Sequence, residues 1–340
     1  MKKKELTMIT QKEIAEKLGI SRTTVARAIN GSPSIKKETK EKIMELVRQY
    51  NYEKNYIGSS LAIKNKKIIY ALVVKSKNEY YTTEINRGLQ EAKDEFKAYN
   101  IKFKIIQTDI NDEKAQLIKL EEILKEKIDG LIITPLAKEK VYKMLKPYIP
   151  ELKIVSIGIR LNRNISHVGP NHKKMGRIAG EIMKNILRDD EKILIIDNGN
   201  DKISSKDYLE GFLSKIKETK LTILGPIKGE GIDNTVSILK KYAKDGELKG
   251  IYINRYSHDS LEKVPKELLM NKKIVTNGME DKIIKLIKNK IVTATIMEEV
   301  FLEGYTAGKK IIELLIKNKI VDNNWEILKP RIIFLENLTD

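Results

Sequence analysis

The chain has no cysteine and only three histidines in 340 residues, and these absences exclude several kinds of site. Without cysteine there can be no disulfide, no thiolate metal ligand and no cysteine nucleophile. No apolar run approaches the roughly 18 residues of a membrane span, and the basic start Met1–Lys4 is not followed by the apolar stretch of a signal peptide. We therefore expect a cytoplasmic protein with no membrane partner.

Patterns that carry catalysis are also missing from the sequence. His167, His172 and His258 lack the spacing of metal ligands, so each is interpreted as a structural or surface histidine. A Gly-Glu-Gly tripeptide at 229–231 is not followed by the third glycine of a dinucleotide loop, and no GxxxxGK[ST] motif occurs. Without a nucleophile–base pair, we predict a protein that is not an enzyme and that holds no cofactor or metal.

Positive charge is abundant and unevenly distributed. Lys and Arg outnumber Asp and Glu by 65 to 47, a net charge of +18, which indicates an acidic partner. Residues 1–67 hold 13 Lys and 3 Arg against 7 Glu, so half of the excess lies on a fifth of the chain. A nucleic-acid-binding domain would produce this gradient, and so would a general bias toward lysine, which is frequent throughout.

The spacing of apolar residues in 10–50 predicts three short helices. The first begins at Thr10, which opens a capping-box pattern, and ends at Gly19. The second begins at Ser21, and the third covers roughly residues 37–50. Two short helices joined by a glycine turn and supported by a third predict a helix-turn-helix, although a generic three-helix bundle fits the same spacing.

The polar face of the second helix separates these two alternatives. It presents hydroxyl and guanidinium groups from Ser21, Arg22, Thr23, Thr24 and Arg27. An arginine can form a bidentate hydrogen bond with guanine in the major groove, and hydroxyls at a helix N-terminus suit phosphates. No acidic residue lies between Lys17 and Glu38 to repel a phosphate backbone. The pattern therefore favours a surface that binds DNA.

The segment TQKEIAEKLGISRTTVARAIN at 10–30, with the TKEKI and NY segments at 39–43 and 51–52, resembles the LacI/GalR family of bacterial transcription regulators. The similarity is most specific in the first 62 residues and extends over nearly the whole chain. The resemblance implies that bases are read by Arg22, Thr23 and Arg27. It implies phosphate contacts by Thr10, Ser21, Thr24, Asn30, Thr39, Tyr52 and Asn55. Lys36 departs from the family pattern, which has a small hydroxyl residue there that can cap a helix.

Residues 54–62 are polar and carry a glycine, yet they end in the apolar pair Leu61 and Ala62. A plain flexible linker is one interpretation. The family resemblance instead implies a hinge helix whose leucine, here Leu61, inserts into the minor groove at the operator centre. Such apolar wedges kink DNA, and added contacts offset the cost of unstacking. Because Ile57 and Gly58 are weak helix formers, we expect this segment to become ordered only on DNA.

From residue 68 onward, short apolar strands alternate with amphipathic helices such as 84–96 and 116–125. Strands are predicted at 68–74, 103–107, 129–134, 153–158, 192–197, 221–227, 250–254 and 273–277. Apolar strands separated by helices are typical of parallel sheets. The two series predict two doubly wound α/β subdomains with a cleft at the carboxyl ends of the strands. The family resemblance implies the type I periplasmic-binding-protein-like fold for this effector domain.

The predicted organisation follows from these segments. The helix-turn-helix domain occupies 1–56, the hinge 57–67 and the effector domain 68–340. Subdomain 1 is placed at about 68–168 and 296–325, and subdomain 2 at about 169–295 and 326–340, with crossings near 168, 295 and 326. The resemblance implies a homodimer, and the end of the chain carries no heptad tail, which favours a dimer over a tetramer.

The resemblance is weakest at the ligand pocket. Tyr208 replaces an arginine of sugar-binding members, Asn277 replaces a common aspartate, and Arg160 occupies an acidic or amide position. These changes alter the hydrogen bonds that a sugar would find, and they make an anionic ligand such as a phosphorylated sugar a hypothesis. Candidate effector-binding residues at the strand ends are Tyr80, Tyr81, Arg160, Asn254, Arg255, Asn277 and Glu298, and the resemblance adds Tyr208. The alternative for each is a surface loop position.

Together these patterns predict a LacI-type, sequence-specific transcription regulator that acts as a repressor. It would bind a palindromic double-stranded DNA operator as a homodimer, and a sugar or sugar derivative in the cleft would control that binding. The alternative is a solute-binding receptor or sensor of the periplasmic-binding-protein class without a DNA role. The absence of a signal peptide and the polar face of the second helix favour the regulator.

Overall fold

The computed structural model describes residues 10–29, 34–50, 66–76, 78–149, 151–199, 202–317 and 325–338. The main division of the chain falls between Lys66 and Lys67 and separates a small helical unit from an α/β unit. Within these ranges, no helix is long and apolar enough to cross a membrane. Several predicted DNA contacts lie outside the described residues, namely Asn30, Tyr52, Asn55, Leu61 and Ala62.

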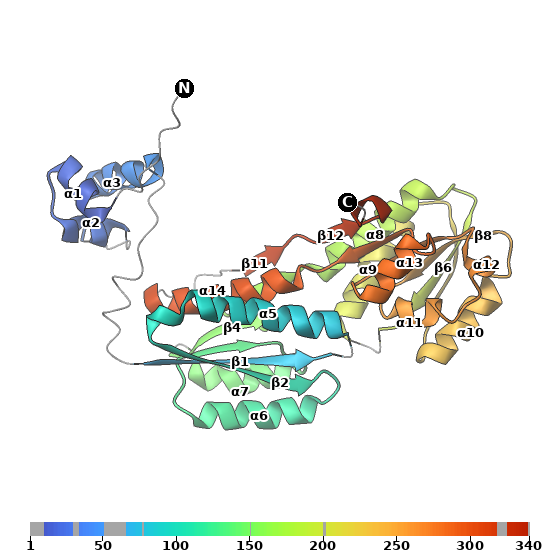
Figure 1. The fold of residues 1–340 in the computed structure, drawn as a ribbon, viewed down its shortest axis with the longest axis horizontal. Coiled ribbons are helices and arrows are strands. Elements are labelled where there is room, and N and C mark those ends of the chain that lie inside the picture. Colours follow the sequence, from blue (N-terminus) through green and yellow to red (C-terminus); the bar gives the residue numbers. More distant parts are fainter. Residues whose placement is uncertain are drawn as a thin grey trace. The chain divides into compact units, whose positions relative to one another are not determined.

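The helical unit contains α1 (Gln11–Leu18), α2 (Arg22–Ile29) and α3 (Lys37–Gln49), as Figure 1 shows. The backbone N–H of Thr10 donates to Oε2 of Glu13 at 2.6 Å, and the N–H of Glu13 donates to Oγ1 of Thr10 at 3.2 Å. This capping box starts α1, and Gly19, at φ +62°, ends it. The predicted helix-turn-helix is therefore confirmed by local contacts of the expected kind.

The core of the helical unit is small and entirely apolar. It is formed by side chains buried from all three helices: Ile14, Ala15, Val25, Ala28 and Ile43. Lys36, which precedes α3, makes no side-chain capping bond, in agreement with the lost hydroxyl at that position. Packing of α3 against α1 and α2, rather than capping, must therefore hold the start of α3.

Subdomain 1 of the α/β unit is built on a parallel sheet of six strands within the described residues. In spatial order the strands are β11 (Trp325–Leu328), β5 (Ser166–Pro170), β4 (Lys153–Ile157), β3 (Gly130–Ile133), β1 (Lys67–Lys75) and β2 (Ile101–Asp109). Tyr70 and Leu72 of β1 pack on one face against α6 (Glu113–Lys125) and α7 (Lys138–Leu145). Figure 1 shows α5 (Glu79–Glu95) and α14 (Val300–Lys317) on the opposite face.

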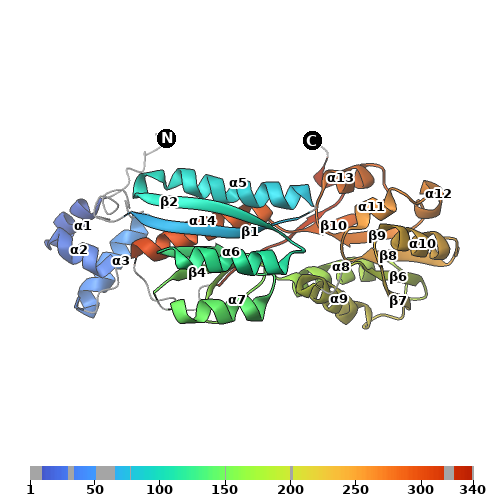
Figure 2. The same cartoon turned by 90° about the horizontal axis from the view of Figure 1, so that it is seen from below.

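Subdomain 2 repeats this arrangement with an antiparallel strand at one edge. Its strand order is β12 (Arg331–Ile333), β10 (Ala294–Met297), β9 (Lys273–Asn277), β8 (Leu248–Ile253), β6 (Lys192–Asp197) and β7 (Thr222–Lys228). One face is covered by α8 (His172–Ile186) and α9 (Ile203–Ile216). The other face is covered by α10 (Ile232–Tyr242), α11 (Ser257–Leu261) and α13 (Asp281–Lys288), with α12 (Lys266–Leu269) nearby, as Figure 2 shows. The predicted doubly wound fold is thus confirmed.

The eight predicted strands are present with shifted ends, whereas β5, β10, β11 and β12 were not predicted. Two of these, β11 and β12, are short edge strands with exposed side chains, so they lack the apolar run of a buried strand. The strand β5 is buried throughout, but its sequence SHVGP contains His, Gly and Pro. Residues of low strand propensity therefore concealed a strand that only sheet pairing reveals.

The chain crosses between the two sheets slightly later than the sequence indicates. Strand pairing in subdomain 1 continues to Pro170 and to Leu328, and pairing in subdomain 2 continues to Met297. The predicted crossings near 168, 295 and 326 therefore fall inside β5, β10 and β11. Because a strand leaves its sheet only where ladder hydrogen bonds end, the crossings follow these three strands instead.

Helix α5 begins earlier than predicted, and this places two candidate residues differently. The N–H of Tyr81 donates to Oδ1 of Asn78 at 2.8 Å, so Asn78 caps the helix ahead of Glu79. Tyr80 and Tyr81, predicted at a strand end, therefore lie in the first turn of α5. Both residues line a cavity at the carboxyl ends of the strands.

Candidate nucleic-acid interface and effector cleft

The predicted base-reading residues lie on the exposed side of α2. Arg22, Thr23 and Arg27 are exposed, whereas Val25 and Ala28 are buried in the helical core. At 100° per residue, the three exposed positions project away from the two buried ones. A single helix therefore presents two guanidinium groups and a hydroxyl on one face, which suits the donors and acceptors of the major groove.

The predicted phosphate contacts within the described residues lie at helix N-termini. Thr10 precedes α1, Ser21 precedes α2 and Thr39 lies in the first turn of α3. The N–H of Thr24 donates to Oγ of Ser21 at 3.0 Å, and the two hydroxyls lie 2.9 Å apart. The first turn of α2 holds no acidic residue, so its positive end suits a phosphate.

A cavity of about 460 Å³ lies between the two subdomains of the α/β unit. Its walls come from segments that follow the carboxyl ends of strands in both sheets, including β1, β3, β8, β9 and β10. The strand order reverses between β1 and β3 in one sheet and between β6 and β8 in the other. Ligands of doubly wound folds bind at such switch points, so the topology itself places this cavity.

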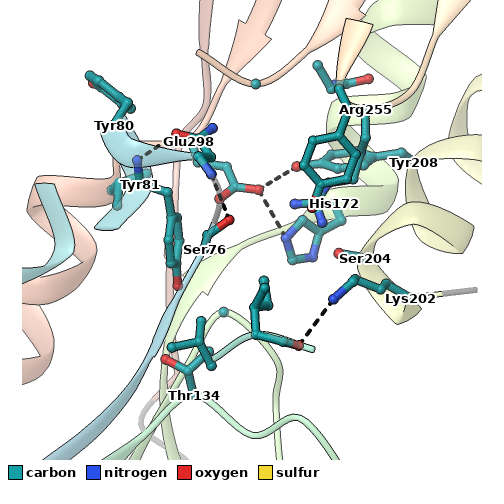
Figure 3. Close-up of a pocket in the computed structure, with 18 of the residues that line it drawn as sticks. Ser76, Tyr80, Tyr81, Thr134, His172, Lys202, Ser204, Tyr208, Arg255 and Glu298 are labelled. Carbon is teal, nitrogen blue, oxygen red and sulfur yellow. Dashed lines mark hydrogen bonds and ion pairs between the residues drawn. The ribbon is translucent and has the colours of Figure 1, made fainter. Parts of the chain in front are cut away.

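The cavity brings together six of the eight predicted effector-binding residues: Tyr80, Tyr81, Tyr208, Arg255, Asn277 and Glu298. Figure 3 shows Arg255, Tyr208 and His172 on one side and Ser76, Tyr81 and Thr134 on the other. Burial, followed by the charge of nearby glutamates, raises the pKa of Tyr81, and burial also raises that of Tyr208. Both phenols therefore remain neutral, and the Tyr208 hydroxyl donates a hydrogen bond to Glu298.

The other two predicted residues, Asn254 and Arg160, do not line the cavity. Asn254 is fully buried, and its Nδ2 donates to Oδ1 of Asp197 at 2.6 Å and to the carbonyl of Ser205 at 3.4 Å. It therefore fixes the end of β8 instead of facing a ligand. Arg160 is exposed, and its guanidinium lies 3.9 Å from the ring centroid of Trp325, which holds it outside the cleft.

Glu298 is the ionised carboxylate of the cavity. Its Oε1 accepts a hydrogen bond from the hydroxyl of Tyr208 and lies 3.3 Å from Nε2 of His172. Burial alone would raise the pKa of Glu298. The hydrogen bond and charge of His172, the charge of Arg255 and the hydroxyl of Tyr208 outweigh burial and lower this pKa to about 2.

Glu303, one turn into α14, is the opposite case. It is 1% exposed and lines the same cavity. Burial, followed by the negative charge of Glu298, raises its pKa well above the ordinary value, and the backbone of Gly158 offsets this only in part. Two neighbouring carboxyl groups therefore differ in protonation, one as an acceptor and one as a donor.

Three buried polar atoms that line the cavity have no hydrogen-bond partner among the described residues. They are Oε1 of Glu303, Oγ1 of Thr134 and Nδ2 of Asn277. The other side-chain atom of Asn277, Oδ1, already accepts from the hydroxyl of Tyr252 at 2.6 Å. Buried polar groups rarely stay unpaired, so these three side chains are candidates for contact with a polar ligand.

Two contacts join the opposite walls of the cleft. The ammonium of Lys202 donates to the carbonyl of Ile110 at 3.3 Å and to Oδ1 of Asn111 at 3.2 Å. On the other side, Nδ2 of Asn78 donates to the carbonyl of Met279 at 3.3 Å. These polar contacts are few and exchangeable with water, so a ligand that bonds both walls can change how the cleft closes.

Several cavity residues were missed by the sequence reasoning. His172 and His258, interpreted as structural or surface histidines, both line the cavity, and Nε2 of His258 lies 2.7 Å from Oε2 of Glu280. Lys202 and Glu303 were also missed. His172 follows the unpredicted strand β5, and applying the strand-end rule to β6 would have led to Lys202. Among the described residues, no group of three His, Asp or Glu side chains is placed to hold a metal ion.

A three-helix unit with an exposed recognition helix, joined to a two-subdomain unit with a ligand cleft, defines the class of ligand-responsive transcription regulators. Comparison with protein families agrees. Residues 10–55 match the model of bacterial regulatory proteins of the lacI family, and residues 70–319 match the periplasmic binding protein domain. The chain belongs to the lacI family of bacterial regulatory proteins, with a periplasmic binding protein domain as its effector unit.

Two kinds of relative illustrate this membership. Catabolite control protein A of Staphylococcus aureus (strain Mu50) is 24% identical over 272 residues, which cover 76% of this chain and 80% of the relative. A probable HTH-type transcriptional repressor, ExuR of Bacillus subtilis (strain 168), is 29% identical over 229 residues, covering 66% of this chain and 63% of the relative.

Solved structures share the fold of the effector unit. An ABC transporter solute binding protein from Burkholderia graminis, in complex with D-arabinose, has a TM-score of 0.71 at 16% identity and covers 81% of this chain and 98% of its own. A protein from Bacteroides fragilis described as a LacI transcriptional regulator has a TM-score of 0.69 at 16% identity, covering 81% and 99%. At these identities the likeness concerns the fold alone.

Proposed function

We propose that this protein is a transcriptional repressor whose binding to an operator is controlled by a small sugar or sugar derivative in the effector cleft. One observation carries the proposal: the same chain presents an arginine- and threonine-bearing helix face and a cleft with unpartnered polar atoms. A homodimer that binds a palindromic operator, with Arg22, Thr23 and Arg27 reading bases, completes the proposal. The proposal also includes contacts of the hinge residues Leu61 and Ala62 with the minor groove of the operator.

The relatives support repression and a sugar-sized ligand. One is named a catabolite control protein and another a transcriptional repressor. Solute-binding proteins of the same fold are found with bound D-arabinose, D-fucose or D-allose. A cavity of about 460 Å³ has room for a ligand of this size. A solute receptor without a DNA role would not account for the exposed guanidinium groups on α2.

The arrangement of the cleft suggests how a ligand controls DNA binding. Glu303 and Thr134 lie in subdomain 1, whereas Asn277 and Arg255 lie in subdomain 2, so one ligand would bond both walls. A ligand that binds one closure angle more tightly than another shifts the population toward it. In a dimer, that shift changes the spacing of the two DNA-binding units and hence the affinity for a fixed pair of half-sites.

Selection of random duplexes by the full-length protein is expected to yield an inverted repeat. Arg22→Ala and Arg27→Ala should each relax the preference at one base position of each half-site, at a cost of roughly 1–3 kcal/mol, because each removes a bidentate contact. The measurement is the affinity for the selected duplex and for single-base variants at a fixed salt concentration, since phosphate contacts make binding salt-dependent.

Arg48→Ala is the matched control for this prediction. Arg48 lies near the end of α3, and its Nε donates to the carbonyl of Met44 at 3.2 Å. Its removal takes away one positive charge without touching α2, so sequence preference should be unchanged. If Arg22→Ala kept the base preferences of the wild type, as Arg48→Ala is expected to do, the role assigned to α2 would be wrong.

A further inference from the structure

We propose that the effector carries an acidic group, a carboxylate or a phosphate, and that Arg255 and Lys202 of subdomain 2 bind this group in the cleft. This inference deepens the proposed function and rests on it. The sequence-based hypothesis of an anionic ligand rested on the changes at Tyr208, Asn277 and Arg160, and Arg160 lies outside the cavity. The cations that support an anion in the structure are Arg255 and Lys202, which both line the cavity.

Arg255 provides the strongest observation. It lines the cavity directly after β8, and among the described residues no carboxylate lies within 4.0 Å of its guanidinium. Its neighbours are the rings of Tyr208 and Tyr256, with centroids 5.7 Å and 5.8 Å from the guanidinium carbon. Guanidinium groups in partly buried sites normally bind carboxylate or phosphate oxygens, so this one lacks its usual partner.

The backbone that carries Arg255 is held firmly. The preceding residue, Asn254, accepts from the N–H of Asn198 at 2.8 Å through Oδ1 and donates to Asp197 through Nδ2. These bonds tie the end of β8 to the end of β6. A group positioned on such a fixed strand end loses little conformational freedom when it binds a ligand, which favours affinity.

Lys202 adds a second cation to the same wall. Burial, followed by the charge of Arg255, lowers its pKa. Its ammonium donates to the neutral oxygens of Ile110 and Asn111, and no carboxylate of the described residues lies within ion-pair distance. Neither Arg255 nor Lys202 forms an ion pair with a carboxylate of the described residues, and the two charges repel each other, so an anion bound near both would be stabilised by them.

The N-terminus of α9 also favours the binding of an anion. Lys202 precedes this 14-residue helix, and Ile203 and Ser204 of its first turn line the cavity. The first turn contains no acidic residue. The free N–H groups and the positive end of the helix dipole therefore add to the attraction for an anion already indicated by Arg255.

The charge of Glu298 attracts Arg255, but no carboxylate of the described residues forms an ion pair with Arg255 or Lys202. Oε1 of Glu298 is bonded to Tyr208 and His172, and Glu280 lies against His258. Glu303 is held in its neutral form by burial, which raises its pKa. The ligand is therefore expected to place its acidic group on subdomain 2 and its hydroxyls against Glu303 and the wall of subdomain 1.

Calorimetry and thermal shift with the full-length protein test this inference. The probes are D-glucose, D-glucuronate and D-glucose 6-phosphate, the corresponding galactose compounds, and inorganic phosphate. At least one acidic sugar is expected to bind about tenfold more tightly than its neutral parent, and Arg255→Met should weaken that binding by about tenfold to a hundredfold. Comparison of uronate with sugar phosphate distinguishes a carboxylate from a phosphate.

Two further variants make the result decisive. Arg255→Lys keeps the charge but loses the planar fork, so it should retain part of the preference for acidic probes. Arg160→Met removes an arginine outside the cavity and should bind like the wild type, and circular dichroism checks that each variant is folded. Tighter binding of the neutral sugars, or acidic probes that stabilise the wild type no more than Arg255→Met, would overturn the inference.

These measurements are made without DNA, so they separate the two proposals. A protein that binds acidic sugars through Arg255 but selects no duplex would disprove the proposed repressor function and leave the cleft assignment intact. A protein that selects an inverted repeat and binds only neutral sugars would support the repressor function and disprove the assignment of an acidic effector.

Discussion

Gly176→Ala is expected to lower the Tm of the effector domain by roughly 5–10 °C and to weaken effector binding with it. Gly176 lies where α8 crosses α9, and an added Cβ would stand 2.0 Å from the carbonyl oxygen of Tyr208. Gly211 faces the carbonyl of Lys173 in the same way, also at 2.0 Å. Because backbone atoms cannot move aside as a side chain can, the two helices must separate.

The effect should reach the ligand site because the same helices hold Glu298. His172 begins α8 and Tyr208 lies in α9, and both contact the carboxylate of Glu298. Separation of the helices would loosen these two contacts. We therefore expect the loss of stability and the loss of effector affinity to occur together.

Gly246→Ala is the matched control, since no heavy atom lies within 4 Å of the position that its Cβ would take. The φ of Gly246 is negative, a conformation that alanine adopts readily. The Tm of Gly246→Ala should therefore stay close to that of the wild type. Thermal unfolding followed by circular dichroism gives the comparison. Equal Tm values for Gly176→Ala and Gly246→Ala would contradict the close helix crossing.

The second large effect is a loss of stability of the effector domain at acidic pH. As the pH falls from about 6.5 to about 4, His167 is expected to reduce the free energy of unfolding of the effector domain by up to about 3 kcal/mol. Burial, followed by the charge of Arg160, lowers the pKa of His167 to about 4, although a hydrogen bond with the backbone of Ser156 acts against this.

The sign follows from where the proton binds. In the unfolded chain, His167 takes up a proton near its ordinary pKa of about 6.5, whereas the folded protein does not until about pH 4. Between these values protonation favours the unfolded state, so stability is present above this window and is lost as the pH falls through it. His167→Gln removes the titrating group and should remove this part of the pH dependence.

Glu303→Gln provides a contrast of opposite sign. The folded protein keeps the Glu303 proton above the ordinary pKa of the side chain, so the wild type loses stability as the pH rises through that range. This variant should therefore gain stability over the wild type at neutral pH, and the gain should vanish below about pH 4.5. Urea unfolding of both variants across pH 4–7.5 measures the two slopes. Slopes equal to that of the wild type would refute both assignments.

Local patterns were sufficient for the helical unit and for most of the strands. The capping pair of Thr10 and Glu13, the stop at Gly19 and the exposed arginines of α2 depend on residues within one or two turns of each other. The buried strands of the parallel sheets are apolar runs that any reader of the sequence can find. These features could be predicted because the interactions that create them join residues that lie close together in the sequence.

The cleft could be predicted in position but only partly in composition. The expectation that residues after strand ends face the cleft placed Arg255, Asn277 and Glu298 on its walls, and the family resemblance led to Tyr208. The strand-end expectation failed for Asn254, because a strand end also needs groups that tie neighbouring strands together. At the end of β8, Asn254 points into contacts within the sheet, whereas the adjacent Arg255 lines the cavity. Only the pairing of the strands decides which of the two residues faces the ligand.

The sequence by itself determined the two kinds of unit, the recognition helix and the approximate place of the cleft, because each depends on local periodicity or on topology. The tertiary structure alone decided the chemistry of the cleft. Glu298 and Glu303 are both acidic in sequence, yet the contacts of Glu298 with His172 and Tyr208 keep it ionised, and burial beside it keeps Glu303 protonated. Charge and protonation in a buried site depend on neighbours brought from distant parts of the chain, which no local pattern records.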